Sequence, residues 1–195
     1  MKFQSICVFC GSNTGNNPVY ANNATQLGRF LAENNIRLVF GGGKVGMMGL
    51  VADAVLHHGG EVLGVIPEFL SLKEVEHSGV KEMIRVKNMH DRKMIMYEQS
   101  DAFIILPGGT GTMDEFFEIL TWSQLGLHTK AIGILNIAGY YDSMIAQLDK
   151  MVAEKFLHPV NRQLVVEDDS LEGLIQKMIR YVAPVKEKWL DRSKT

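Results

Sequence analysis

Short apolar runs alternate along the chain with longer stretches in which apolar residues return every three or four positions. A short apolar run bounded by turn residues is typical of a buried strand, and the three-to-four spacing is typical of an amphipathic helix. The runs predict strands at residues 5–10, 37–40, 61–66, 101–106, 131–135 and 163–166, and a short one near 83–86 within an otherwise loop-like segment, 68–87. The spacing predicts helices from Pro18 onward, after an N-cap at Asn17, and at 46–58, 88–100, 112–125, 140–155 and 171–182.

Apolar strands that alternate with amphipathic helices predict a parallel sheet with helices on both faces. We therefore expect an α/β fold, a Rossmann-like doubly wound parallel sheet. A length of 195 residues suits a single domain, which we expect to span residues 1–183, with residues 184–195 as a charged, frayed tail. In such sheets, ligands bind at the carboxyl ends of the strands.

The composition is that of an ordinary globular protein, with 46% hydrophobic and 22% charged residues. The net charge of −2 gives no bulk attraction to nucleic acid or to a membrane surface, so we expect neither as a partner. No apolar run approaches the roughly 20 residues of a membrane span, and the apolar stretch at residues 6–10 is too short for a signal peptide. We expect the protein to be cytoplasmic.

Cys7 and Cys10 form a C-x-x-C pattern that is typical of redox or metal sites in other contexts. Here they fall within a predicted strand, where side chains three positions apart point to opposite faces of the sheet. We therefore interpret them as buried structural thiols. The six histidines lack metal-ligand spacing, and no metal site is expected.

Three predicted strands end in glycine-rich turns, which a parallel sheet would bring to the same edge. The turns contain Gly11 and Ser12, the run 41–49, and the run 107–115. The third turn lies between a strand and a helix, so its N–H groups and the helix dipole favour an anion. Glycines also serve tight turns and packing, which remains the alternative for the first two turns.

A dinucleotide fingerprint is disfavoured in this chain. Gly41, Gly43 and Gly46 fit G-x-G-x-x-G, but they follow the second strand, and Glu68 is a poor match for the required acid. The sequence also lacks a glycine-lysine-serine/threonine tripeptide, which a phosphate-binding P-loop would need.

Two further groups carry candidate chemistry. Glu115 lies in the first turn of the helix after the third glycine turn, and it either forms a capping box with Thr112 or serves as a catalytic carboxylate. Arg92 and Lys93 form either a solvated helix face or an anion-binding pair, in which the guanidinium offers a bidentate fork.

In order and spacing, these motifs resemble those of the LOG (Lonely Guy) family, the cytokinin riboside 5′-monophosphate phosphoribohydrolases. The resemblance covers about residues 6–181 and includes Gly-Gly-Gly-x-x-Gly-x-Met-Gly, Met-His-x-Arg-Lys, Pro-Gly-Gly-x-Gly-Thr-x-x-Glu, Thr-Trp-Ser-Gln-Leu-Gly and Gly-Tyr-Tyr. It implies hydrolysis of the N-glycosidic bond of a nucleoside 5′-monophosphate, without metal or organic cofactor, by an enzyme that is usually a homodimer. The decarboxylase label sometimes given to the family would require a Schiff-base lysine with a supporting acid, and no lysine here stands out for that role.

The resemblance also implies roles for individual residues. Arg92 and Glu115 correspond to the catalytic pair. The expected substrate-binding residues are Ser12, Gly43, Met47, Glu74, Lys93, Gly108, Gly109, Thr110, Gly111 and Thr112. Lys73 and Asp114 depart from the residues usual in plant members, so the resemblance leaves both AMP and its N6-prenylated form as expected substrates.

Cleavage would build an oxocarbenium-like cation on the ribose, which a carboxylate stabilises. We expect the helix N-terminus to keep Glu115 ionised and to bind the 5′-phosphate. Three groups remain candidates for protonating the departing base: Asp91, Asp114 and Glu118. The alternatives are a non-catalytic nucleotide-binding or carrier module, and a general purine monophosphate nucleosidase in base salvage.

The methionine-rich predicted helix at 88–100 and the helix at 112–125 are the expected contacts of a homodimer. Glu74, in the loop before the first of these helices, is expected to help complete a site near the interface.

Overall fold

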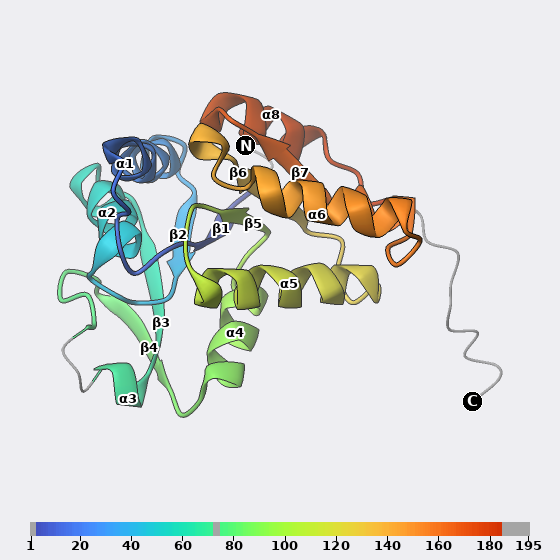
Figure 1. Cartoon of the computed structure of the whole chain (residues 1–195). Coiled ribbons are helices and arrows are strands. Elements are labelled where there is room, and N and C mark those ends of the chain that lie inside the picture. Colours follow the sequence, from blue (N-terminus) through green and yellow to red (C-terminus); the bar gives the residue numbers. More distant parts are fainter. Residues whose placement is uncertain (1–2, 72–74, 185–195) are drawn as a thin grey trace.

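The computed structural model describes residues 3–71 and 75–184. Its core is one parallel sheet of seven strands in the order β4-β3-β2-β1-β5-β6-β7 (Figure 1). The strands are β1 (Ser5–Phe9), β2 (Arg37–Phe40), β3 (Val62–Pro67), β4 (Glu82–Val86), β5 (Ala102–Ile105), β6 (Ala131–Leu135) and β7 (Val165–Asp168). The helices are α1 (Pro18–Glu33), α2 (Gly46–His57), α3 (Glu68–Ser71), α4 (Met89–Glu98), α5 (Thr110–Gln124), the 3-10 turn η1 (Ile137–Gly139), α6 (Asp142–Ala153), α7 (Pro159–Arg162) and α8 (Leu171–Arg180).

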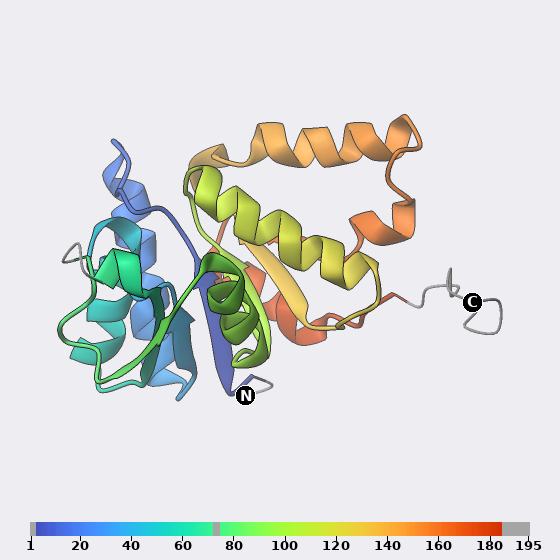
Figure 2. The ribbon, with the colours of Figure 1, turned by 90° about the horizontal axis from the view of Figure 1, so that it is seen from below.

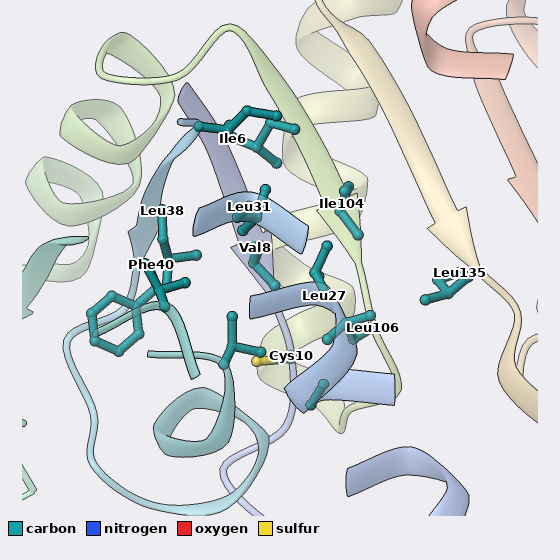
Figure 3. Close-up of a cluster of buried hydrophobic side chains, with 14 of the residues drawn as sticks. Ile6, Val8, Cys10, Leu27, Leu31, Leu38, Phe40, Ile104, Leu106 and Leu135 are labelled. Atoms are coloured by element: carbon teal, nitrogen blue, oxygen red, sulfur yellow. The ribbon is translucent and has the colours of Figure 1, made fainter. Parts of the chain in front are cut away.

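Successive residues of each strand point to opposite faces of the sheet, where they belong to two different apolar clusters. Both faces of the sheet are therefore buried. One cluster joins alternate strand residues such as Ile6 and Val8 to α1, α2 and α8. Figure 3 shows Leu27 and Leu31 of α1 beside these strand residues. The other joins Phe9 and Phe103 to residues of α4, α5 and α6. The helices therefore form two layers around the sheet, with α4, α5 and α6 on the same side in Figure 2.

The order of the strands reverses between β1 and β5. From β1 the chain builds outward through β2, β3 and β4, and it then returns to the other side of β1 with β5, β6 and β7. The carboxyl ends of the two strands at such a switch point diverge into a crevice where α/β proteins bind ligands. The turns after β1 and β5 are two of the three glycine-rich turns.

The expected fold is confirmed: the sheet is parallel, doubly wound and covered on both faces. The cysteine interpretation is also confirmed. Cys7 and Cys10 are free, buried and members of opposite clusters. No helix in the described ranges is long and apolar enough to cross a membrane.

The differences from the predicted elements lie at helix ends, in short helices and in the last strand, which was expected at 163–166 and is β7 at Val165–Asp168. α3, η1 and α7 were not predicted, and the helix expected at 140–155 is α6, which runs from Asp142 to Ala153. Ala138 and Gly139 of η1, whose φ angles are 52° and 70°, precede it. α5 begins at Thr110, two residues earlier than expected. The predicted tail lies outside the described residues from position 185 onward.

Candidate active site

The three glycine turns meet at one edge of the sheet, as the sequence predicted. The Gly11 N–H donates to the Pro107 carbonyl at 3.0 Å, and the Met47 N–H donates to the Gly11 carbonyl at 3.0 Å. A Cβ on Gly46 would lie 2.2 Å from the carbonyl carbon of Ser12, and one on Gly108 would lie 2.8 Å from the Gly11 nitrogen. Glycine is required at these positions because the turns pack backbone to backbone.

Two other glycines have no such structural need. A Cβ on Gly109 or Gly111 would meet nothing within 4 Å, and neither residue has a positive φ. Gly109 is the N-cap of α5, with φ −92°, and supplies no side-chain cap. The first N–H groups of this 15-residue helix have no side-chain cap, and residues 109–111 are exposed, which suits an anion.

The start of α5 rules out the capping-box interpretation of Glu115. That interpretation needs Thr112 at the N-cap, but Thr112 lies inside the first turn and is buried. The side chain of Glu115 instead points toward α4, where its Oε1 atom is 3.5 Å from Nη1 of Arg92. Both side chains are about nine-tenths buried.

Arg92 is held mainly by the backbone at the carboxyl ends of two strands. Its Nε donates to the Val65 carbonyl at 3.1 Å, and its Nη2 donates to the Gly41 carbonyl at 3.3 Å. A Cβ on Gly41 would lie 1.7 Å from Nη2, so only glycine leaves room for the guanidinium. This role of Gly41 could not be predicted from the sequence, because the contact depends on the order of strands in the sheet.

The charge state of Glu115 requires a correction. We expected the helix N-terminus to keep this carboxyl ionised, but burial raises its pKa from 4.5 to about 7. The guanidinium of Arg92 opposes the shift, the charge of Asp114 adds to it, and Lys93 opposes it. Near neutral pH, Glu115 therefore exists in both its ionised and its protonated form.

Lys93 is bound to two carboxylates of α5. Its Nζ lies 3.0 Å from Oδ2 of Asp114 and 3.0 Å from Oε2 of Glu118. Burial would lower the pKa of Lys93, but hydrogen bonds to Glu118 and Asp114 outweigh it and raise that pKa. Two of the three candidate proton donors, Asp114 and Glu118, are thus held by a cation. The third, Asp91, accepts a hydrogen bond from the side chain of Asn88 at 2.9 Å.

The remaining predicted substrate-binding residues are divided among three environments. Ser12 and Thr110 are exposed at the edge where the turns meet. Gly43 is buried and pairs with Glu76 in an isolated antiparallel bridge. Met47 is 1% exposed and belongs to the core, and its N–H bonds to the Gly11 carbonyl of the neighbouring turn. Glu74 lies outside the described residues.

A shallow groove of about 500 Å³ follows the outer face of α5 from Thr110 to Trp122. Asp114 and Glu118 lie on its wall, together with apolar groups such as Phe117. Among the described residues, no group of three or more His, Cys, Asp or Glu side chains is placed to hold a metal ion.

Comparison with known proteins gives sequence relatives over nearly the whole chain. A family model described as possible lysine decarboxylase matches residues 48–178. A probable cytokinin riboside 5′-monophosphate phosphoribohydrolase of Oryza sativa subsp. japonica is 51% identical over 180 residues, which cover 92% of this chain and 81% of the relative. A cytokinin riboside 5′-monophosphate phosphoribohydrolase of Arabidopsis thaliana is 48% identical over 181 residues, 93% of this chain and 85% of the relative.

Solved structures agree on the fold. The molybdenum cofactor binding protein from the phototrophic bacterium Rippkaea orientalis aligns with a TM-score of 0.66 over 90% of this chain and 96% of its own. The two sequences are 23% identical, and the likeness shows the fold alone.

Proposed function

Since the chain belongs to the LOG family of cytokinin riboside 5′-monophosphate phosphoribohydrolases, we propose that it hydrolyses the N-glycosidic bond of an N6-substituted adenosine 5′-monophosphate. The products are the free cytokinin base and ribose 5-phosphate. Water supplies the hydroxyl group that the ribose gains and the proton that the base gains.

The observation that carries this proposal is the buried pair of Arg92 and Glu115 beside the open N-terminus of α5. Loss of the base leaves an oxocarbenium-like cation on the ribose. An ionised carboxylate about 4 Å from that cation supplies roughly 4 kcal/mol at an effective dielectric constant of 20. Because the cation develops only in the transition state, this attraction raises the turnover and not merely the affinity.

Arg92 fixes the position of the acid. With Nε and Nη2 engaged by the carbonyls of Val65 and Gly41, the guanidinium presents Nη1 to Glu115 from a fixed direction. Its positive charge also favours the ionised form of Glu115 against the effect of burial. In this proposal Arg92 holds the Glu115 carboxylate in position and favours its ionised form.

The 5′-phosphate is assigned to the first turn of α5. The N–H groups there are open, the helix dipole favours negative charge, and Gly109 and Gly111 leave space for close approach of a phosphate. Glu115 lies about one and a half turns along the same helix, so the phosphate and the catalytic carboxylate are held on one rigid element.

The test is base release from matched substrates. The protein is incubated with AMP, with N6-isopentenyl-AMP and with the two corresponding nucleosides, and base and ribose 5-phosphate are measured by chromatography. We expect equimolar products from a monophosphate and none from the nucleosides. Equal rates on AMP and its N6-substituted form would indicate a general purine monophosphate nucleosidase. Tight nucleotide binding without any base release would indicate a non-catalytic carrier.

The assembly we propose is a homodimer formed through α4 and α5. These neighbouring helices, linked by the Lys93 to Asp114 ion pair, expose Met94 and Phe117, which are 44% and 38% exposed. Leu125 and Leu127, at the end of α5, are more than half exposed. Exposed apolar side chains on these two helices and just after α5 support association with a second copy.

A further inference from the structure

The turn between β5 and α5 is held by three successive carbonyls, each with a donor from a different place. The Leu106 carbonyl accepts from the hydroxyl of Tyr141 at 2.7 Å. The Pro107 carbonyl accepts from the Gly11 N–H at 3.0 Å. The Gly108 carbonyl accepts from the hydroxyl of Tyr140 at 2.6 Å. Each peptide plane in the turn is therefore fixed from outside.

The third of these bonds determines where a free donor points. In a trans peptide the carbonyl of one residue and the N–H of the next point in opposite directions. With the Gly108 carbonyl directed at Tyr140, the Gly109 N–H is directed away from it. That N–H donates to no described residue, and the space around Gly109 is open. Tyr140 thus orients an N–H group at the proposed phosphate site.

The backbone around Tyr140 is strained, and side-chain hydrogen bonds hold it in place. Ala138 has a φ of 52°, a left-handed conformation that residues with a Cβ seldom adopt. The side chain of Asn136 accepts from the Tyr141 N–H at 2.7 Å and donates to Oδ1 of Asp142 at 2.7 Å. Strained backbone persists only where its surroundings fix it, and it gathers at functional sites. The segment 136–142 therefore holds Tyr140 and Tyr141 in a fixed position.

The two tyrosines differ in burial. Tyr141 is 3% exposed and belongs to the apolar cluster under α4, α5 and α6, so its hydroxyl is part of the core. Tyr140 is 44% exposed and packs edge-on against Tyr20 of α1, with ring centroids 5.7 Å apart. The ring of Tyr140 also packs edge-on against Tyr141, with ring centroids 4.8 Å apart, and its hydroxyl is the group that bonds to the turn.

We propose that Tyr140 is a positioning residue of the phosphate-binding turn, whose hydroxyl holds the Gly108 carbonyl so that the Gly109 N–H faces the 5′-phosphate. This inference rests on the proposed function, since it takes the first turn of α5 as the phosphate site. Tyr140 acts through the turn and need not touch the substrate.

The test compares Tyr140→Phe with Tyr20→Phe. The first substitution removes the hydroxyl and keeps the ring, and the second removes a hydroxyl that bonds to no described residue from the same aromatic pair. Binding of ribose 5-phosphate, AMP and adenosine is measured by calorimetry. We expect Tyr140→Phe to weaken ribose 5-phosphate and AMP about tenfold, with adenosine unchanged. We expect Tyr20→Phe to leave all three affinities unchanged.

A structural role for the hydroxyl would lower the affinity for adenosine as well, and that result, or unchanged binding of ribose 5-phosphate, would overturn the proposal. If Tyr140→Phe unfolds, the amide signal of Gly109 in the wild-type protein is followed by NMR during titration with ribose 5-phosphate, and no shift would likewise overturn it. Hydrolysis by the wild-type protein is measured separately. A wild type that binds ribose 5-phosphate through Tyr140 without cleaving AMP or N6-isopentenyl-AMP would refute the proposed function alone.

Discussion

Glu115 combines a catalytic charge with an environment that disfavours charge. Burial raises its pKa to about 7, so only part of the protein carries the ionised form at neutral pH. If the carboxylate is the active form, the rate falls about tenfold for each pH unit below 7 and levels off above about pH 8. A rate that rises as the pH falls would instead identify the protonated acid as the active form.

Glu115→Gln should lower turnover at least ~100-fold while nucleotide affinity stays within about tenfold.

The same shifted pKa makes a prediction about folding. The folded chain binds the Glu115 proton more tightly than the unfolded chain, whose carboxyl has a pKa of 4.5. The resulting stabilisation is complete below about pH 4.5 and is lost as the pH rises through about 7. Between pH 5 and pH 8 the loss amounts to about 2 to 3 kcal/mol, at about 1.4 kcal/mol per pKa unit. Urea titrations should show that Glu115→Gln gains this amount relative to wild type over that interval, and parallel pH profiles would contradict the shift.

At the scale of elements, the glycines at the start of α5 have two different roles. Some are needed for folding, and others leave space for a ligand. Gly111→Ala places a methyl group where the free protein has open space, and alanine is the better helix former. We expect the ligand-free variant to gain about 0.5 to 1 kcal/mol in urea unfolding and to bind ribose 5-phosphate more weakly. Gly108→Ala would place its Cβ 2.1 Å from Oγ1 of Thr112, so that variant should lose stability. If the Gly111→Ala variant binds ribose 5-phosphate as tightly as the wild type, the assignment of the phosphate to this turn is wrong.

Elements whose periodicity is local could be predicted from the sequence, and contacts that need the sheet order could not. The strands were identified because both faces of the sheet are buried, which makes their apolar runs continuous. The start of α5 was misplaced because Thr112 suits an N-cap better than Gly109, whereas packing of the turn on Gly11 sets the actual boundary. The Arg92 to Gly41 contact spans 51 residues and exists only because α4 packs against β3, the neighbour of β2 in the sheet.

For the whole molecule, the exposed face of α4 and α5 predicts association. A charge on Met94 would have to be desolvated in a dimer formed there, so Met94→Asp should convert the protein to monomers at micromolar concentration. Phe156→Asp is a matched control, because Phe156 is 89% exposed and belongs to the segment after α6 instead of to α4 or α5. Sedimentation velocity distinguishes the species. A wild-type protein that is monomeric and fully active at that concentration would refute the proposed dimer.

The two buried cysteines allow opening of the native fold to be measured by chemical labelling. Cys7 lies in β1, which pairs with β2 on one side and β5 on the other, and Cys10 follows directly after it. Burial raises the pKa of both thiols, and alkylating reagents attack only the thiolate. Cys7 is 0% exposed, so a reagent reaches its sulfur only when the centre of the sheet separates, whereas Cys10, in the turn after β1, is 8% exposed. The rate at which iodoacetamide labels Cys7 in the native protein then reports opening of the sheet, without denaturant and without an introduced probe.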